Sequence, residues 1–479
     1  MALPDDTPGR RTADPEKVLD SRRWVALGVL LLVQFMLILD ASAATIALPS
    51  IGSDLGFSRA GLTWVIDGYV LMAGGLLLLG GRLGDVLGRR RMFMAGVVVF
   101  GLSSLVCGVA QNPEQLVAAR FVQGIGEALA APAALGLIAL LFTDRSERTK
   151  AIGLFGGISG LGGTAGPLLS GVLVEFASWR WIFLINIPVA VAALVLVPRL
   201  VSGGRPSGKW SSIDIPSSVG IVLAFTAIVF GAIEAATNPW TSLQVVGFIS
   251  GGVALLAAVL VHQTRARDPL VPLHFFTDRT RLSANLVTVF FYAVFFSQFY
   301  FVTLYLQTVV GLSPLETGLS FLPFGITIGI GLSIATALVP RLGLRSVLVV
   351  GTSLAAVGVW LLSGITPDGS YVSDVLAGSL VLAFGSGLVL PCLQIGAVNA
   401  VTESDAGLAS GVQQSLQQVA GAVGLAVLVS LAIGRSDGSG LEPAAATVDG
   451  YQLAFTVGTA ILVVAAVTSF VVPRGASRA

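Results

Sequence analysis

The sequence predicts an all-α polytopic membrane protein with fourteen membrane-spanning helices. Hydrophobic residues make up 54% of the 479 positions and charged residues only 11%, whereas charged residues are about 25% of an ordinary soluble domain. The apolar residues fall into long runs, and Lys and Arg gather in alternate segments between those runs. These observations exclude a soluble globular protein and predict a multi-pass protein of the inner or plasma membrane.

The apolar runs have the length that a bilayer demands. A hydrocarbon layer about 30 Å thick requires roughly 20 apolar residues per helix. Fourteen runs fit, at residues 24–48, 62–81, 92–110, 115–142, 149–174, 181–198, 215–235, 242–261, 283–309, 315–339, 346–363, 374–398, 407–432 and 451–472. The first run is too long for a signal-peptide core and lacks a small-residue cleavage site, so we expect it to be a retained span.

The basic residues predict the topology, because cytoplasmic loops carry an excess of Lys and Arg. With a cytoplasmic N-terminus, 23 of the 27 Lys and Arg residues lie in inner segments. Only Arg59, Arg180 and Arg435 lie in outer segments, and Arg120 lies within a span. Adding or omitting one span would invert every later loop, so we expect an even number of spans and both termini in the cytoplasm.

A repeated turn predicts the domain organisation. The charged turn at residues 81–91 joins the second and third runs, and a similar sequence at 339–345 joins the tenth and eleventh. Internal repeats of this kind are typical of transporters. We predict a cytoplasmic tail at 1–23, a six-helix bundle at 24–200, a linker with two extra transmembrane helices at 201–282, a second six-helix bundle at 283–473 and a cytoplasmic tail at 474–479.

Four ionisable residues lie inside spans of the first half: Asp40, Asp67, Arg120 and Glu127. Each costs at least about 2.5 kcal/mol near a helix centre, which favours a functional role. The helical rise places the first three in the outer half of the bilayer and Glu127 near its centre, on the same helix face as Arg120. One reading assigns proton coupling to Asp40, Arg120 and Glu127, and substrate binding to Asp67 and Glu127. The alternative is a permanent Asp40–Arg120 pair with Asp67 solvated at the interface.

The run at 149–174 contains eight glycines and Pro167. Small residues let helices approach closely, and proline bends a helix. A tightly packed helix explains this composition, and a role in conformational change remains an alternative to packing alone. We also expect Asp85 and Arg89 of the charged turn to hold it against the other bundle in one state. The candidate conformational residues are Gly81, Asp85, Gly88, Arg89, Arg90, Gly162, Gly166 and Pro167.

Polar side chains also recur in spans of the second half. Gln298 and Tyr305 lie in the run at 283–309, and Gln414 lies in the run at 407–432. We predict that they contact substrate. Hydrogen bonding between helices is the structural alternative, with comparable weight.

Several sequence features point away from other function classes. The chain has no GxxxxGK[ST] or HExxH motif, and Cys107 and Cys392 have no Cys or His at ligand spacing. A net charge of +1 gives no nucleic-acid footprint. We therefore expect no enzyme activity, no cofactor, no metal and no nucleic-acid partner. The expected energy source is a proton gradient, the expected partners are a small-molecule substrate, protons and the lipid bilayer, and the expected state is a monomer.

Six motifs together resemble the major facilitator superfamily, in particular its fourteen-span drug:proton antiporters of the EmrB/QacA type. They are the charged turn from Gly81 to Arg90, the segments Leu39–Pro49 and Trp64–Tyr69, the segment Arg120–Gly126, the segment Gly162–Gly171, and the segment Trp179–Pro188. The resemblance implies proton coupling for Arg120, recognition of lipophilic cations for Asp67 and antiport for the glycine-proline helix. Glu127 and Gln417 depart from the family pattern.

The function expected from these features is proton-coupled export of lipophilic, cationic or amphiphilic drugs, dyes or antibiotics, by alternating access between two bundles. Such a protein gives multidrug efflux and antibiotic resistance. The nearest alternative is a dedicated exporter of one endogenous metabolite or antibiotic. Two alternatives from other classes are a membrane-embedded enzyme and a transport-dead receptor, and both are disfavoured by the absence of a catalytic constellation and of an extramembrane domain.

Overall fold

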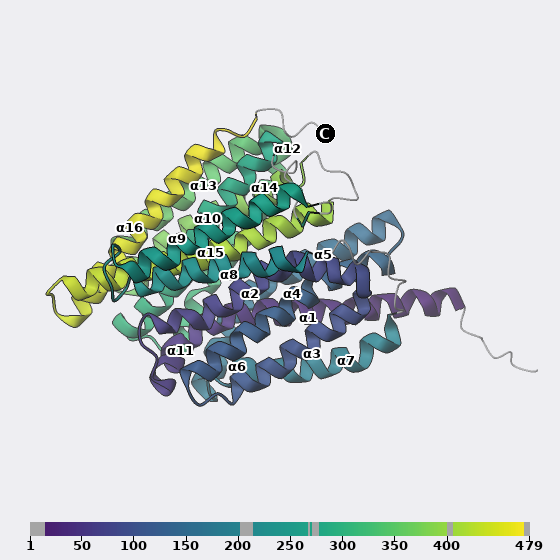
Figure 1. Cartoon of the computed structure of the whole chain (residues 1–479), viewed down its shortest axis with the longest axis horizontal. Helices are drawn as coiled ribbons and strands as arrows, with labels where there is room; N and C mark the ends of the chain where they lie inside the picture. Colours follow the sequence, from purple (N-terminus) through teal and green to yellow (C-terminus); the bar gives the residue numbers. More distant parts are fainter. Residues whose placement is uncertain (1–14, 202–213, 267–268, 271–276, 400–405, 474–479) are drawn as a thin grey trace, which may run out of the picture.

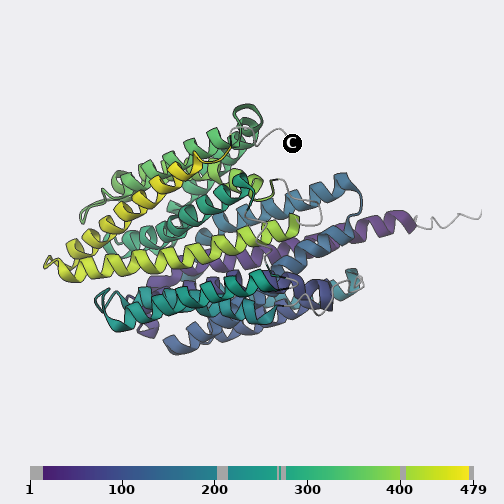
Figure 2. The ribbon, with the colours of Figure 1, turned by 45° about the horizontal axis from the view of Figure 1, so that its top comes forward.

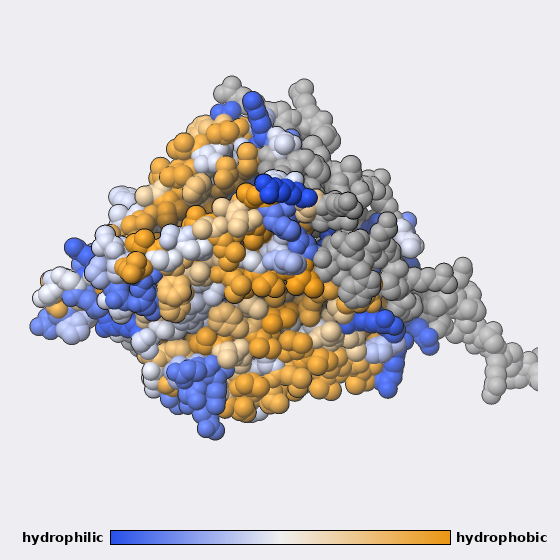
Figure 3. Space-filling view, viewed as in Figure 1, coloured by the Kyte–Doolittle hydropathy of each residue, from blue (hydrophilic) through white to orange (hydrophobic). Residues whose placement is uncertain are grey.

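The computed structural model describes residues 15–201, 214–266, 269–270, 277–399 and 406–473. All regular secondary structure within these ranges is helical. Fourteen helical segments are long and apolar enough to cross a membrane, and they match the fourteen predicted runs one to one. Figure 3 shows a broad apolar band over the middle of the molecule, with polar residues toward its ends. The predicted fold class and number of spans are confirmed.

The first half runs from α1 to α7 and provides six spans. Its sixth span is broken at Ile185, where a short helix gives way to a longer one that begins at Asn186. The elements are α1 (Pro15–Leu55), η1 (Gly61–Thr63), α2 (Trp64–Leu87), α3 (Arg89–Gly108), α4 (Pro113–Leu141), α5 (Arg145–Phe176), α6 (Trp181–Leu184) and α7 (Asn186–Leu200).

The second half also provides six spans, three of which are irregular. A break at Phe321 precedes Pro323, which cannot supply a backbone N–H to continue the preceding helix, and two spans include a π-helical turn. The elements are α10 (Arg279–Leu304), η4 (Tyr305–Val309), α11 (Pro314–Ser320), α12 (Leu322–Leu342), α13 (Leu344–Leu362), η5 (Tyr371–Leu376), α14 (Ala377–Ala397), α15 (Ala406–Gly438) and α16 (Pro443–Ser469).

The two halves lie side by side with their helices running in the same general direction (Figures 1 and 2). The start of α1 and the end of α16 lie at the same end of the bundle, which we call the terminal end; the other is the far end. Within the first half α1 packs on α5 and α4 packs on α2 and α3, and within the second half α10 packs on α15 and α14 on α12 and α13. One cluster of buried apolar residues joins the far-end part of the first half to the second half, and a second cluster fills the rest of the first half and reaches α15.

Two further helices, α8 (Ile215–Glu234) and α9 (Leu243–Arg265), form an antiparallel pair between the halves in sequence. Helix α8 contacts α2 of the first half and α15 of the second, and α9 packs on α8. Asp214 caps α8 through Ser217 N and accepts a hydrogen bond of 2.5 Å from Gln263 Nε2 of α9. Burial raises the pKa of Asp214, but the bonds from Ser217 and Gln263 and the charge of His262 outweigh it and lower the pKa overall.

The repeated turns have the same backbone geometry. Gly88 and Gly343 have φ of 100° and 81°, a conformation that favours glycine. In the first turn Arg89 forms a 3.1 Å ion pair with Asp85 and donates to the carbonyl of Gly136 in α4 at 2.9 Å. These contacts fasten the turn to its own half, whereas the sequence suggested a contact with the other bundle in one state.

Candidate functional site

A buried ion pair lies at the centre of the first half. Asp40 of α1 and Arg120 of α4 are 1% and 0% exposed, and their Oδ2 and Nη1 atoms are 2.5 Å apart. The structure therefore brings together the two residues that the sequence placed at similar depth. An ionised group buried in this way is tolerated when it is paired and hydrogen-bonded.

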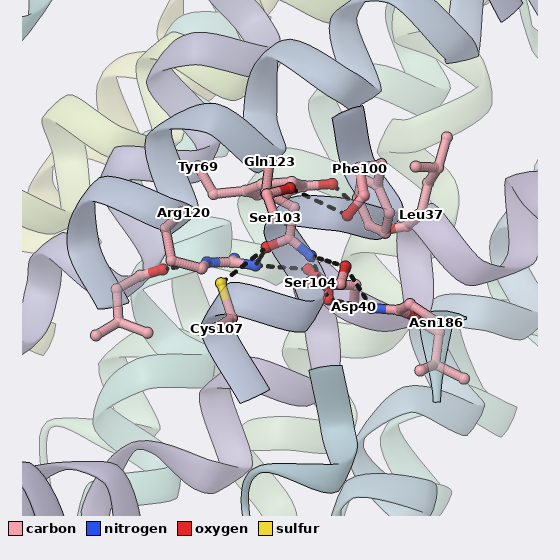
Figure 4. A network of polar contacts seen from close by, with 12 residues as sticks. Leu37, Asp40, Tyr69, Phe100, Ser103, Ser104, Cys107, Arg120, Gln123 and Asn186 are labelled. Atoms are coloured by element: carbon pink, nitrogen blue, oxygen red, sulfur yellow. Dashed lines mark hydrogen bonds and ion pairs between the residues drawn. The ribbon is translucent and has the colours of Figure 1, made fainter. Parts of the chain in front are cut away.

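Amide and hydroxyl side chains complete the surroundings of the pair (Figure 4). Asp40 Oδ1 accepts hydrogen bonds from Gln123 Nε2 at 2.9 Å and Asn186 Nδ2 at 2.7 Å. Gln123 Oε1 accepts from Arg120 at 2.6 Å, and Gln123 Nε2 also donates to Ser104 Oγ at 2.8 Å. We call these five residues the Asp40–Arg120 network. It joins α1, α3, α4 and α7.

Arg120 is held from other directions as well. Its Nε donates to the carbonyl of Val65 in α2 at 2.7 Å. Its guanidinium carbon lies 4.2 Å from the ring centroid of Tyr69 and 5.6 Å from that of Phe183. Cation–π contacts of this kind add about 2 kcal/mol when they are desolvated. The arginine thus has one fixed position in this conformation.

Sequence reasoning did not assign roles to Gln123, Ser104 and Asn186. Gln123 lies almost one turn after Arg120, and the break at Ile185 sets Asn186 at the start of α7, where it reaches Asp40. In the sequence, these three residues can be noticed only as polar side chains inside apolar runs. That signal does not identify the partner, because the partner lies on another helix.

Glu127 lies at the seam between the halves. Its side chain is 7% exposed, and Oε1 accepts a 3.3 Å hydrogen bond from Gln418 Nε2 of α15. Oε2 is buried without a hydrogen-bond partner in the part of the chain that the structure describes. Glu127 is two helical turns from Arg120 on α4, toward the terminal end. A carboxyl group next to the Asp40–Arg120 network thus contacts the opposite half directly.

The other predicted substrate residues are dispersed. Asp67 is 0% exposed and makes no hydrogen bond to any described residue, so it is not solvated here as the structural alternative proposed. Gln298 is 1% exposed, and neither of its side-chain polar atoms has a described partner. Gln414 is half-buried on α15. The Tyr305 hydroxyl lies at the far end, where its one proton is shared between two acceptors, Thr366 O at 2.8 Å and Asp374 Oδ2 at 3.0 Å.

The glycine-proline segment of α5 contacts both halves. On one side Gly162 and Gly166 pack against α1, and Ser170 Oγ donates to Ala43 O at 2.7 Å. On the other side Gly171 leaves no room for a Cβ, which would lie 2.6 Å from the carbonyl oxygen of Pro314 in α11. A Cβ on Gly318 of α11 would lie equally close to the carbonyl of Pro167. These glycines let α5 and α11 close the far end.

Two polar contacts support the same closure. Gln307 Nε2 donates to the carbonyl of Ile46 in α1 at 2.9 Å, which links the halves near the far end. Arg59 and Asp437 form a longer pair of 3.8 Å, and both side chains are 65% exposed. The exposed pair adds little stability, so the closure depends mainly on the packing of α5 against α11.

Toward the terminal end, no described residue covers the same face of α5 at its glycines. Gly153 precedes Gly171 by about five helical turns and so lies on the same face. A Cβ on Gly153, Gly156 or Gly157 would meet nothing within 4 Å. Ile152 and Leu154 are each 42% exposed. Within the described ranges, the halves are therefore packed together along α5 at the far end and apart along α5 at the terminal end.

The chain is similar to known proteins in sequence and in fold. The sequence model of the Major Facilitator Superfamily matches residues 30–425. The chain is 39% identical over 462 residues to the puromycin resistance protein pur8 of Streptomyces alboniger, covering 94% of this chain and 92% of that protein. It is 38% identical over 435 residues to the lincomycin resistance protein of Streptomyces lincolnensis, covering 91% and 89%.

More distant proteins share the same architecture. The multidrug transporter protein MdtP of Bacillus subtilis is 30% identical over 422 residues, covering 87% of this chain and 76% of that protein. Among solved structures, a bacterial homologue of the human lysosomal transporter Spinster, in an inward-facing and unoccupied conformation, superposes with a TM-score of 0.67. The sequence identity is 16%, and the match covers 94% of this chain and 97% of that one.

Proposed function

The chain belongs to the Major Facilitator Superfamily and is a membrane transporter rather than an enzyme, and we propose that it exports amphiphilic drugs or antibiotics in exchange for protons. Relatives at 39% and 38% identity are named for resistance to puromycin and lincomycin, which supports this class of cargo. A gradient supplies about 2.3 kcal/mol per charge per 100 mV, so exchange for protons needs no bound cofactor.

The observation that carries the proposal is the position of Glu127. One of its oxygens bonds to Gln418 of the opposite half, and the other has no partner among the described residues. A carboxylate can bind either a proton or a cationic group of the cargo. Because separation or closure of the seam changes the surroundings of Glu127, it also changes which of the two is bound more strongly. Competition for one carboxylate couples the two flows.

We assign the Asp40–Arg120 network a linked role. It lies within one half and its groups are hydrogen-bonded to one another. Protonation of Asp40 would remove the counter-charge of Arg120, whose guanidinium would then act on Glu127 two turns away. A proton at Asp40 therefore favours the ionised form of Glu127 and the release of a proton from it.

The direction follows from topology and shape together. The excess of Lys and Arg supports a cytoplasmic terminal end, and the uncovered face of α5 lies at that end. In this conformation cargo would reach Glu127 from the cytoplasmic side. Export then requires α5 and α11 to separate at the far end while the terminal half of α5 closes on the second half.

A dedicated exporter of one antibiotic is the second candidate. It is favoured by the names of the relatives at 38–39% identity, which refer to single antibiotics. The multidrug relative is less similar, at 30% identity. The two candidates share the proposed mechanism and differ only in the breadth of the cargo.

Everted membrane vesicles test both candidates. A pH-sensitive dye reports the proton gradient while ethidium, puromycin or lincomycin is added, and we expect at least one compound to dissipate the gradient. Glu127→Gln should abolish the response, whereas Asp368→Asn, on an exposed loop residue, should leave it unchanged. Dissipation by one compound alone would favour the dedicated exporter. A Glu127→Gln protein that keeps the full response to every active compound would overturn the role of Glu127.

A further inference from the structure

Asp67 lies outside the Asp40–Arg120 network, in the first turn of α2 near the far end. It lies on the face of α2 that meets the second half. Gly74, two turns later on the same face, leaves no room for a Cβ against Gln418 of α15. Trp64 and Gly68 instead contact Phe121 of α4. Asp67 therefore lies at the seam that separates when the far end opens.

Tyr300 of α10, in the second half, lies within electrostatic range of Asp67. Tyr300 is 2% exposed and lies near enough to Thr63 and Asp67 to interact with both electrostatically. Thr63 is itself 0% exposed. Asp67 is thus buried beside neutral polar side chains, and no described Lys, Arg or His forms an ion pair with it.

Helix α4, which packs on α2, carries Glu127, whose Oε1 bonds to Gln418 of α15 two helical turns further toward the terminal end than Arg120. Arg120 of α4 is bound to Asp40 of α1 and to the carbonyl of Val65. Tyr451 of α16 lies within electrostatic range of Tyr300. Other nearby charged groups pair with residues other than Asp67. Two pairs lie near the tip of α15: Arg59 with Asp437, and Arg435 with Asp449. Asp54 pairs with Arg180, and Glu234 of α8 accepts hydrogen bonds from Asn238 and Gln244. None of these is an ion-pair partner of Asp67 in the described ranges.

An ionised carboxylate in such a place costs far more than a neutral carboxyl group, because nothing replaces its lost hydration. We propose that Asp67 is a second proton-binding site, separate from the Asp40–Arg120 network, and that it must be protonated for the far end to close. The proposal rests on the proposed function in one respect: the far end opens to the outside during export.

The proton at this site is not transported. With the far end open, water reaches Asp67 and its carboxylate takes a proton from that water, forming one O–H bond. Closure buries the neutral acid while the terminal end is open, so the proton has no route to the terminal side through the packed seam. It returns to the outer water when the far end opens again. Asp67 thus sets the closure equilibrium, whereas Glu127 and Asp40 carry the exchange.

The sign of the pH dependence follows directly. The closed far end holds one more proton than the open one, so external acid favours closure. A single linked proton changes the closed-to-open ratio by up to about tenfold per pH unit. The sequence predicted instead that Asp67 contacts a cationic substrate, and that role would require a substrate to reach it.

Cysteine labelling from outside whole cells tests the proposal. Thr317 of α11 is 0% exposed beside α5, so Thr317→Cys reports opening of the far end. The native Cys107 and Cys392, both buried, are replaced by Ala. Labelling of Thr317→Cys by an impermeant maleimide is measured at pH 5.5 and 7.5. At each pH it is divided by the labelling of Asp368→Cys, which lies exposed in a far-end loop. The ratio corrects for the pH dependence of the maleimide reaction itself.

We expect normalised labelling of Thr317→Cys to fall at least threefold at pH 5.5. With Asp67→Asn, a neutral group of the same shape, labelling should be low at both pH values. Glu127 also changes its surroundings when the seam opens, so the comparison is made in the Glu127→Gln background, which should keep the pH response that arises from Asp67. In that background, a pH response that survives Asp67→Asn would overturn the proposal, as would high labelling of the Asp67→Asn variant at both pH values. The assay requires no transported drug, so its result tests Asp67 even if the vesicle experiments show no drug export. Unlabelled Asp368→Cys would refute the topology and, with it, this site and the direction of export.

Discussion

Replacement of Asp40 by asparagine tests the energetic importance of the buried pair. Asn keeps the shape of the side chain and an oxygen that can accept from Gln123 and Asn186, but it leaves Arg120 without a counter-charge. Removing one partner of a buried ion pair costs about 3–5 kcal/mol. We expect Asp40→Asn to lower the free energy of unfolding by that amount and to abolish proton-coupled export.

Asp54 supplies a matched control on the same helix. It pairs with Arg180 at 2.6 Å, but the two side chains are 46% and 33% exposed, and exposed pairs contribute up to about 1 kcal/mol. Unfolding of purified protein in mixed micelles, followed by tryptophan fluorescence, compares Asp40→Asn with Asp54→Asn. Adding Arg120→Gln to Asp40→Asn should restore part of the loss, since no unpaired charge then remains buried. Equal, small losses for Asp40→Asn and Asp54→Asn would refute this reasoning.

Three further predictions concern other parts of the fold. Gly171→Ala should destabilise the closed far end by about 1–3 kcal/mol through overpacking and so raise the labelling of Thr317→Cys. Gly153→Ala is the control: a Cβ at Gly153 meets open space, so the labelling should not change. Asp214→Ala should lower stability by about 0.5–2 kcal/mol through loss of a helix cap. Folding lowers the pKa of Asp214, so its contribution to stability is present at neutral pH and is lost as the pH falls through the pKa of the folded state. Chemical unfolding measures the free energy of unfolding of the variant and the parent at pH 7 and in acid. The difference between the two proteins should be smaller in acid. Tyr305→Phe should lower stability by about 1–2 kcal/mol through loss of the shared hydrogen bond of its hydroxyl and leave drug efflux rates unchanged; a changed rate would support the predicted substrate contact.

The sequence predicted the spans well because span length is a local property. Each run of about 20 apolar residues must form its own backbone hydrogen bonds inside a bilayer, so its helical state does not depend on its neighbours. Local sequence was less informative at span ends. Helix α16 begins at Pro443 rather than near residue 451, because its first turns, with Asp449 paired to Arg435, extend beyond the apolar run.

The candidate site was predicted only in part, because its contacts join distant residues. The depth of Asp40 and Arg120 followed from helical rise, but the partners that surround them required the packing of α1, α3, α4 and α7. Hydropathy likewise could not distinguish a solvated Asp67 from a buried one. Whether its side chain meets water depends on the helix that covers it, and that helix lies in the other half.

Helix α8 makes the two sides of the seam unequal. It bridges α2 and α15, so it covers one border between the halves, and α9 lies outside it. The opposite border, between α5 and α12, has no such cover among the described helices, and toward the terminal end α5 is bare there. Helix α8 therefore keeps contact with both halves at one border, while the opposite border is formed by α5 and the second half alone among the described helices. An amphiphile dissolved in the leaflet at the terminal end therefore meets two different borders between the halves. One is covered by α8, and the other, beside α5, is left uncovered by the described helices.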